Sequence, residues 1–391
     1  MMDWQQINEM IASSSRILLT SHENPDGDGL GSAVAMYHHL REKGKECRII
    51  NCSQLPEEYD FLNHDSIIEM YAAEEHDEWL RNCDLAIIFD VGAFRRLRGI
   101  KDAIDRYDIK IIGTEYKSLD LAEDRGSFST LLKDNNIPYP DFGVATTAKE
   151  AVKISKKLDF PILVRPSYVL GGQGMKIVIN EQELEEHIVD ILGKIPNNKL
   201  LLDHYLDGAI EAEADAISDG KDVYIIGIME HIEPCGIHSG DSNATLPVFS
   251  LGDFIIQQIK DHTKKIALAL NTVGLINVQF AIKDDKVFVI EANPRASRTV
   301  PFISKAYKEP YVNYATKIML GKNKVKDFKF NPSLKGYAIK QPVFSFDKFP
   351  NVNKQLGPEM KSTGESILFI DDLNDDAFLE LLSRRKMYLT K

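Results

Sequence analysis

Strand and helix patterns alternate along the first 112 residues, and this alternation restricts the folds open to the chain. Short β-rich runs occupy residues 16–21, 46–50, 85–89 and 109–112. The segments between them have the apolar spacing of helices, over residues 29–43, 66–81 and 93–106. The run at 85–89 is apolar throughout, as expected for a strand buried on both faces of a sheet. The alternation predicts a parallel sheet covered by helices.

The pattern changes from Gly113 onward, where longer helices and groups of neighbouring strands follow. We expect helices over residues 121–135, 147–158, 181–192 and 254–270, the second of them capped by Thr147. We expect strands at 161–165 and 175–179, a β-rich tract over 200–233, a hairpin from 277, and strands near 337–339 and 367–370. The chain therefore divides into a first unit at residues 1–111 and a second unit at residues 112–391.

Composition narrows the classes of function. With 391 residues, 43% of them hydrophobic, the chain can bury the cores of two or three domains. The net charge of −12 disfavours a broad nucleic-acid surface, because phosphate binding needs clustered Lys and Arg. The four cysteines form no Cys-x-x-Cys pair, which indicates reduced thiols. We see neither an apolar run of membrane-span length nor a signal peptide, so we expect a cytoplasmic protein.

Three oxygen-bearing side chains gather on the expected hairpin. Gln279, Glu291 and Asn293 lie on or just after two β-type runs joined by a turn at Asp284 and Asp285. Alternation along a strand puts Glu291 and Asn293 on one face, and the hairpin brings Gln279 to the same end. Amide and carboxylate oxygens suit Mg²⁺ bound to the phosphates of a nucleotide. The pattern indicates an ATP-using enzyme, although an ordinary hairpin with a polar end has the same residues.

A glycine-rich loop at residues 165–174 is a second sign of phosphate binding. Gly171 and Gly172 let backbone N–H groups approach phosphate oxygens, and Arg165 offers a forked guanidinium at the end of the preceding strand. The loop lacks the Gly-Lys-Ser/Thr ending of a P-loop, and a flexible hairpin tip is the alternative.

Other polar groups are ambiguous when each is taken alone. Arg125 on a helix, and Glu211 and Glu213 on a strand, are more often surface charges, although Glu211 has the chemistry to accept hydrogen bonds from a ribose. The run at residues 229–242 is dense in histidines and carboxylates. Their spacing matches no standard zinc pattern, so we favour substrate and nucleotide contacts there.

From about residue 112 to the C-terminus, the chain closely resembles the second synthetase half of the carbamoyl phosphate synthase large chain, which is an ATP-grasp enzyme. The matching motifs are residues 112–114, 120–125, 164–172, 227–233, 236–242, 277–280, 291–302 and 356–365. They are long, and together they imply an ATP-grasp fold for this part of the chain. Residues 1–110 do not resemble the Rossmann-like domain that should precede it.

The resemblance also implies roles for individual residues. Gln279, Glu291 and Asn293 would hold the divalent metals, Mg²⁺ or Mn²⁺. Arg295 and Arg298 would face the acyl substrate and the transferred phosphate. The ATP site would be lined by Arg125, Arg165, His204, Leu206, Glu211, Gly236, Ile237, His238 and Ser239, with Gly171 and Gly172 in the mobile loop over the phosphates. Residues 173–174 are Gln-Gly where the family usually has Arg-Ala, which removes one cation near the phosphates.

The reaction implied by the resemblance is the ATP-dependent phosphorylation of carbamate to carbamoyl phosphate, a step of arginine and pyrimidine biosynthesis. Its small-molecule substrates would be ATP and either carbamate or bicarbonate and ammonia. A glutaminase subunit or the missing first synthetase half would be the protein partner.

The first unit resembles the start of the DHH phosphoesterases, at residues 18–32 and 84–92. A loop after a buried strand would present His22, Asp26 and Asp28, and Asp90 would end a neighbouring strand at the same edge of a Rossmann-like sheet. One imidazole and three carboxylates suit a Mn²⁺ site that activates water. The Asp-His-His tripeptide and the second domain of that family are missing, so we predict a vestigial metal site and no phosphoesterase activity.

Three interpretations of the whole chain follow. The first is an ATP-grasp ligase in which the N-terminal unit replaces the usual first domain. The second is a DHH-type, Mn-dependent hydrolase remnant with an unrelated passenger, which hydrolysis of a short oligonucleotide would favour. The third is a hybrid that catalyses nothing, which a failure to bind Mg-ATP would favour.

Overall fold

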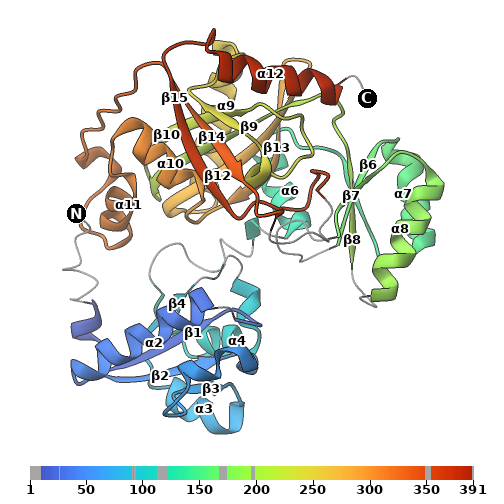
Figure 1. Cartoon of the computed structure of the whole chain (residues 1–391). Helices are drawn as coiled ribbons and strands as arrows, with labels where there is room; N and C mark the ends of the chain where they lie inside the picture. The colour runs from blue at the N-terminus through green and yellow to red at the C-terminus, as the bar shows by residue number, and fades with distance from the viewer. Residues whose placement is uncertain are drawn as a thin grey trace.

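A computed structural model describes residues 10–25, 27–89, 91, 94–111, 121–122, 124–166, 174–194, 199–347 and 354–389. Three sheets organise this part of the chain (Figure 1). One belongs to the first unit and is parallel, and the other two belong to the second unit and are antiparallel. The predicted α/β class, with a parallel sheet at the N-terminal side, is confirmed.

The first unit is a sheet of order β3-β2-β1-β4 with helices around it. Its strands are β1 (Arg16–Ser21), β2 (Glu46–Asn51), β3 (Ile68–Met70) and β4 (Leu85–Phe89). Its helices are α2 (Gly27–Glu42), α3 (Ala73–Leu80) and α4 (Gly99–Arg106), with the 3-10 turns η1 (Glu57–Leu62) and η2 (Phe94–Leu97). Of the strand expected at 109–112, residues 109–111 are described, and Ile111 alone among them forms an isolated parallel bridge, to Ala86.

Two helix predictions in the first unit are wrong in part. The helix expected over 66–81 begins only at Ala73, because Ile68–Met70 pair with the edge of β2 as strand β3. Such pairing is a long-range contact that local periodicity does not show. The helix expected over 93–106 is divided at Arg98, whose positive φ of 48° is incompatible with a continuous helix.

The second unit begins with helix α6 (Arg125–Asp134) and a four-stranded antiparallel sheet of order β5-β8-β6-β7. Its elements are β5 (Phe142–Ala145), α7 (Ala148–Leu158), β6 (Ile162–Pro166), β7 (Lys176–Val178), α8 (Glu181–Lys194) and β8 (Leu200–His204). Thr147 caps α7 as predicted, since its Oγ1 accepts a hydrogen bond from the Glu150 N–H at 3.2 Å. The two helices α7 and α8 bury their apolar faces against this sheet.

The largest sheet has seven strands in the order β13-β12-β9-β10-β11-β14-β15. Its strands are β9 (Ile210–Asp219), β10 (Val223–His231), β11 (Ala244–Leu246), β12 (Val273–Lys283), β13 (Lys286–Asn293), β14 (Tyr337–Val343) and β15 (Gly364–Ile370). Its helices are α9 (Asp253–Ala269), α10 (Thr299–Tyr307), α11 (Tyr311–Met319) and α12 (Asp376–Leu389), with the 3-10 turns η3 (Ser239–Asp241) and η4 (Val325–Asp327).

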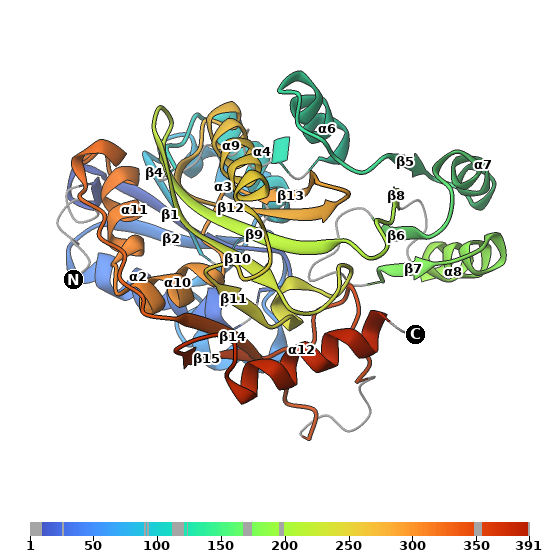
Figure 2. The ribbon, with the colours of Figure 1, turned by 90° about the horizontal axis from the view of Figure 1, so that it is seen from above.

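The alternation of residues along β9 decides what each face of this sheet carries. Ala212, Ala214 and Ala216 face α9, and their small side chains allow that helix to pack directly on the sheet (Figure 2). The opposite face carries Glu211, Glu213 and Asp215 and becomes apolar again at Ile217, where α10 and α11 cover it. The same strand therefore contributes to a core on one face. On the other face Glu211, Glu213 and Asp215 form a buried acidic surface, which we call the acidic floor.

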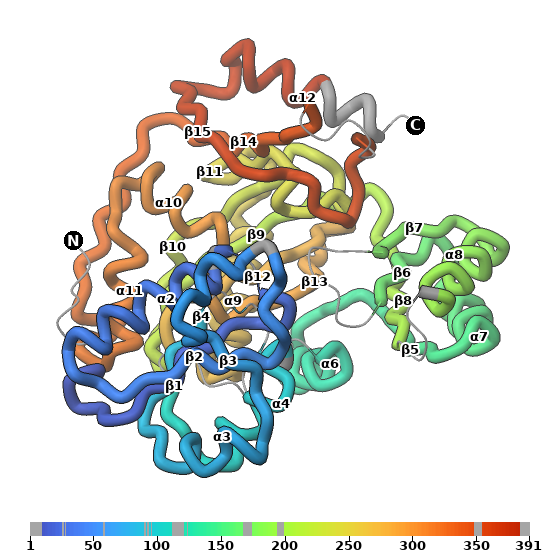
Figure 3. The backbone as a smooth tube through the Cα atoms, turned by 60° about the horizontal axis from the view of Figure 1, so that its bottom comes forward, coloured from blue at the N-terminus to red at the C-terminus, as the bar shows by residue number. Residues whose placement is uncertain are grey.

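The clusters of buried apolar side chains among the described residues fall either within the first unit or within the rest of the chain. Figure 3 shows the first unit in blue and the four-stranded sheet with its helices in green as separate groups of elements. All four cysteines are free thiols, and three of them are buried. Within the described ranges, no helix has both the length and the apolar character needed to cross a membrane.

Candidate active site

The structure brings the three predicted metal ligands together. Gln279 on β12 lies opposite Glu291 on β13, and Asn293 follows two residues later on the same face. Asn293 Nδ2 donates a hydrogen bond to Glu291 Oε1 at 2.9 Å. The hairpin turn has positive φ at both Asp284 and Asp285, as in the type I′ turns of two-residue hairpins.

This donor set fits a hard divalent cation. All three side chains are half-buried, and each offers an amide or carboxylate oxygen of the kind that Mg²⁺ prefers. Gln279 Nε2 donates to Ser239 Oγ at 3.3 Å, which leaves the amide oxygen of Gln279 for a ligand. Asn293 Oδ1 accepts a hydrogen bond from Arg295 Nη2 at 3.2 Å, so a cation bound at this oxygen requires Arg295 to turn away.

Two arginines share one buried carboxylate beside this hairpin. Arg125 Nη2 donates to Asp203 Oδ1 at 3.0 Å, and Arg165 Nε lies 3.0 Å from Asp203 Oδ2. Arg125 Nη1 also donates to the Ile290 carbonyl, next to Glu291. Burial lowers the pKa of Arg125, and the charge of Asp203 opposes that effect. Two cations on one anion leave a net positive charge, which suits a bound phosphate.

The buried Nε of Arg125 has no hydrogen-bond partner within the described residues. An unpaired buried donor on a cation is costly unless a ligand or water satisfies it, which makes it a second sign of an anion site. Asp203 was not among the residues chosen from the sequence. It is an isolated acid on a strand, and only the tertiary contacts of Arg125, at the start of α6, and of Arg165, on β6, show that it joins two arginines.

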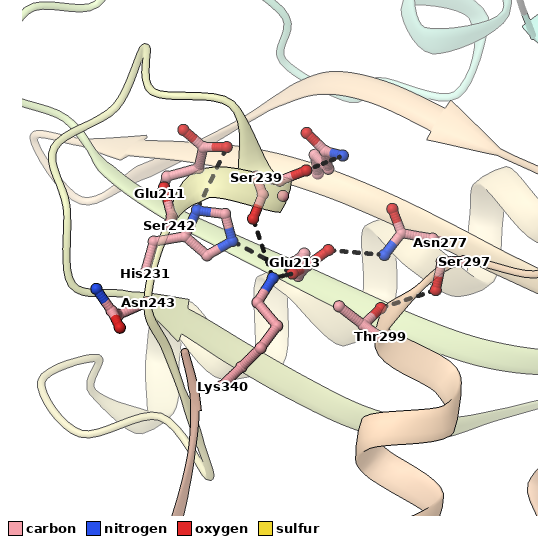
Figure 4. Close-up of polar contacts among 12 residues, drawn as sticks. Glu211, Glu213, His231, Ser239, Ser242, Asn243, Asn277, Ser297, Thr299 and Lys340 are labelled. Carbon is pink, nitrogen blue, oxygen red and sulfur yellow. Dashed lines mark hydrogen bonds and ion pairs between the residues drawn. The ribbon is translucent and has the colours of Figure 1, made fainter. Parts of the chain in front are cut away.

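The acidic floor of the large sheet is a connected polar network (Figure 4). Glu213 Oε1 lies 3.3 Å from His231 Nε2 and 3.7 Å from Lys340 Nζ, and Glu213 Oε2 accepts a hydrogen bond from Asn277 Nδ2 at 3.0 Å. Burial raises the pKa of Glu213, but the Lys340 and His231 contacts outweigh it and lower the pKa to about 2. Glu211 Oε1 lies 3.5 Å from His231 Nδ1. The two glutamates therefore lie in the interior of the protein on a central strand. They are not the surface charges that a glutamate on a strand usually is.

The predicted nucleotide residues 236–239 lie at the end of the loop after β10 and at the first residue of η3. Gly236 has φ of 95°, and a Cβ there would lie 2.8 Å from the Tyr205 hydroxyl, so a glycine is required. The Nδ1 of His238 accepts a hydrogen bond from the Gly240 N–H at 3.0 Å, and burial lowers the pKa of His238. The carboxylate of Asp241 accepts hydrogen bonds from the backbone N–H groups of Lys361 and Ser362, which ties the predicted motif at 356–365 to this loop.

His204 and Leu206 line a cavity of about 290 Å³ on the hairpin side of the site. The other lining residues are Lys283, Asp284, Lys286 and Phe288. His204 Nδ1 lies 2.8 Å from the carbonyl oxygen of Leu158, which fixes the ring at the end of α7. The cavity therefore lies where the four-stranded sheet meets the β12–β13 hairpin.

Several predicted site residues lie outside the described residues: Asp26, Asp90, Gly171, Gly172 and the side chain of Asp28. His22 is described and buried, and its Nδ1 lies 2.9 Å from Arg96 Nη2 and 2.8 Å from the carbonyl oxygen of Glu23. In the described part of the chain, His, Cys, Asp and Glu side chains form no metal-binding group of three.

An antiparallel sheet that contributes Arg165 and Asp203, next to a larger sheet whose hairpin contributes amide and carboxylate oxygens, is the arrangement of the ATP-grasp class. Solved structures share the fold. Biotin carboxylase of Campylobacter jejuni has a TM-score of 0.60 at 15% identity, covering 95% of this chain and 90% of that one. An ADP complex of N5-carboxyaminoimidazole ribonucleotide synthetase has a TM-score of 0.61 at 13% identity, covering 96% and 97%. The biotin carboxylase domain of Hydrogenobacter thermophilus 2-oxoglutarate carboxylase, with MgADP and bicarbonate, has a TM-score of 0.62 at 16% identity, covering 96% and 89%.

Sequence comparison gives the family. The profile of the carbamoyl-phosphate synthase L chain, ATP binding domain, matches residues 124–325. The carbamoyl phosphate synthase large chain of Archaeoglobus fulgidus is 42% identical over 379 residues, which is 93% of this chain and 34% of that protein. The C-terminal section of the large chain of Aquifex aeolicus is 39% identical over 375 residues, 90% of this chain and 70% of that section. The chain belongs to the carbamoyl phosphate synthase large-chain family and is an ATP-grasp ligase.

The same comparisons refine the domain picture. The chain spans about a third of the full large chains that it matches. The profile of the DHH family, N-terminal domain, matches residues 16–138, which confirms the second resemblance. Residues 112–391 make up less than three quarters of the chain, so the 93% match to the Archaeoglobus fulgidus protein extends into the first unit, where we expected none.

Proposed function

We propose that this chain transfers the γ-phosphoryl group of ATP to carbamate, forming carbamoyl phosphate and ADP. The observation that carries the proposal is the cross-strand set of Gln279, Glu291 and Asn293 beside the two arginines joined by Asp203. The family of the chain supports the same reaction.

In this proposal the base of ATP enters the 290 Å³ cavity between His204, Leu206 and Phe288. Its phosphates then run along the hairpin toward Glu291, past Arg125 and Arg165. The Hydrogenobacter thermophilus domain was solved in complex with MgADP and bicarbonate, which supports a nucleotide, a metal and a small carboxylate-like substrate for a protein of this fold.

The residues of the chain position and neutralise charge rather than form covalent bonds. Arg125 and Arg165 hold the phosphates, and the metal, when bound by Gln279, Glu291 and Asn293, would neutralise charge on the phosphate oxygens. Arg295 and Arg298 stabilise the transferring group from the side of the acyl substrate. An oxygen of carbamate attacks the γ-phosphorus, the bond from this phosphorus to the β–γ bridging oxygen breaks, and ADP leaves.

The test is ADP release from Mg-ATP in an equilibrated bicarbonate and ammonia solution, with formation of ATP from carbamoyl phosphate and MgADP as the reverse assay. We expect turnover in both directions and a loss of about a hundredfold or more in Glu291→Ala, because this change removes a proposed ligand of the cation that stabilises the charge of the transition state. Glu185→Ala, an exposed change on α8, is the control and keeps full activity. Equal turnover in Glu291→Ala and in the unaltered chain would contradict the site assignment.

The chain spans about a third of the full large chains that it matches. We propose the first synthetase half of the family or a glutaminase subunit as the partner that supplies the carbamate or ammonia. Co-purification of either partner, with ADP release that no longer needs added ammonia when glutamine is present, would support this assignment. A complex in which ADP release still needs added ammonia in the presence of glutamine would contradict this choice of partner.

The match to the DHH family leads to a second candidate, hydrolysis of a short oligonucleotide by the first unit. We propose that this activity is lost, because the Asp-His-His tripeptide is missing from the sequence. Incubation of a dinucleotide with the chain and Mn²⁺ should leave it intact. Hydrolysis that disappears in His22→Ala would overturn this proposal.

A further inference from the structure

The segment that carries Arg295 and Arg298 is attached to the acidic floor through Asp215. Ser297 Oγ donates to Asp215 Oδ1 at 2.6 Å, and Thr299 Oγ1 donates to Asp215 Oδ2 at 2.5 Å. Asp215 is fully buried, whereas Arg295 and Arg298 are exposed. The two hydroxyl groups lie on either side of Arg298 in the sequence, so both backbone neighbours of this arginine are held by one carboxylate.

We infer that Asp215 is a positioning residue, which sets the reach of Arg295 and Arg298 toward the transferring phosphate by holding Ser297 and Thr299. The inference rests on the proposed function, in which these arginines face that phosphate. Asp215 does not touch the substrate in this scheme, and it acts through the backbone of residues 295–299.

The location of Asp215 favours such a role over a purely structural one. Ile217, the next residue on the same face of β9, packs in the apolar cluster under α10 and α11. An apolar residue at position 215 would extend that cluster, whereas a buried carboxylate requires hydrogen bonds to offset its lost hydration. Those hydrogen bonds come from Ser297, Thr299 and Asn277.

Asn277 connects the carboxylate of Asp215 to the β12–β13 hairpin, which carries the proposed metal ligands. Its Nδ2 lies 3.2 Å from Asp215 Oδ2 and 3.0 Å from Glu213 Oε2, and it pairs with Asn293 across β12 and β13. Asp215 therefore contacts the strand that carries Gln279 as well as the segment that carries the two arginines. A group that joins both determines the distance between the cation and the arginines, and an error of about 1 Å there can cost about a hundredfold in rate.

The test uses a matched pair of variants at Thr299. Thr299→Val keeps the shape but removes the hydroxyl, and Thr299→Ser keeps the hydroxyl. We expect Thr299→Val to lower kcat for ADP formation roughly ten- to a hundredfold, with KM for ATP changed less than about twofold, and Thr299→Ser to retain most of kcat. Thr263→Val on α9 is the control, because Thr263 is also fully buried but donates only to the Ile259 carbonyl. A general packing defect would lower the stability of the variant, but it would not lower kcat selectively while KM for ATP stays nearly unchanged.

Ser297→Ala is a second variant at a half-buried position, and thermal unfolding shows whether each variant is folded. Wild-type kcat in both Thr299→Val and Ser297→Ala would overturn the inference, as would a Thr299→Ser variant as impaired as Thr299→Val. Alanine variants of the two arginines test their proposed role separately from the positioning role of Asp215. If Arg298→Ala and Arg295→Ala both keep full turnover, the proposed role of the arginines fails and the inference fails with it. If they lose turnover while the hydroxyl variants do not, only the positioning role fails.

Discussion

Gln279 Oε1 and the carboxylate of Glu291 belong to directly opposed residues of β12 and β13, in a hairpin whose register shifts by one residue immediately beyond this pair. The shift leaves Ile290 outside the pairing, and its carbonyl accepts a hydrogen bond from Arg125. Without the bulge, the side chains beyond it would exchange faces, because a slip of one residue reverses the orientation of every side chain in a strand. The irregular pairing thus keeps the oxygens together and joins them to the arginine pair.

Replacing Glu291 by Gln should weaken metal binding while keeping the size of the side chain. The amide retains an oxygen but removes a negative charge from the cation site, so the Mg²⁺ concentration that supports half-maximal ADP formation should rise about 10- to 100-fold. A titration of activity with Mg²⁺ at saturating ATP measures this change. An unchanged Mg²⁺ requirement would show that Glu291 does not contact the cation.

Replacing Asp203 by Asn should leave the buried guanidinium group of Arg125 and the half-buried one of Arg165 without their shared anion. We expect a loss of about 3–5 kcal/mol in the free energy of unfolding, as is usual when one partner of a buried ion pair is removed. Chemical denaturation of this variant measures the loss. The double variant Asp203→Leu, Arg125→Met removes an anion and a cation together and should recover part of the stability, and a failure to recover it would contradict the pairing.

The pH dependence of stability should reflect Asp215. Burial, reinforced by the negative charge of Glu213, raises the pKa of Asp215 to about 7 from 3.8. A raised pKa means that the folded chain holds this proton more tightly than the unfolded chain. The stability from this group is therefore complete below about pH 3.8 and is lost as the pH rises toward 7, by up to about 1.4 kcal/mol per pH unit. Asp215→Asn should flatten that decline in urea unfolding between pH 5 and pH 7 (roughly the upper part of this window), and an unchanged slope would contradict the assignment.

Replacing Asp241 by Ala should release the segment that it holds over the loop at 236–239. The lost acceptor leaves the buried Ser362 N–H and the Lys361 N–H without their partner, which costs about 1–3 kcal/mol. Hydrogen exchange should become faster in residues 357–362, and KM for ATP should rise because the loop is predicted to contact the nucleotide. Asp261→Ala on the exposed face of α9 is the control and should change neither measurement.

Local sequence predicted much of the secondary structure. The strands at 16–21 and 85–89 occur with the predicted bounds. The helix predicted over 147–158 differs from α7 by one residue at its start, and the helix predicted over 254–270 is shifted by one residue from α9. These elements carry their own periodicity and caps, so neighbouring residues determine them. The edge strand β3 was missed because its pairing with β2 depends on residues about twenty positions away.

The candidate site divides in the same way. Gln279, Glu291 and Asn293 were found from the sequence because one hairpin with a two-residue turn holds all three, whereas the bulge at Ile290 that sets Gln279 opposite Glu291 was not predicted. Asp203 and Asp215 were not found, and neither was Lys340, because the partners of each lie far away in the sequence. Their partners come from α6, from the segment after β13 and from the opposite half of the sheet. The sequence by itself determined the hairpin with its three oxygen-bearing side chains and the class of fold. Only the tertiary structure decided which buried charges neutralise one another, since that depends on distances between strands far apart in the chain.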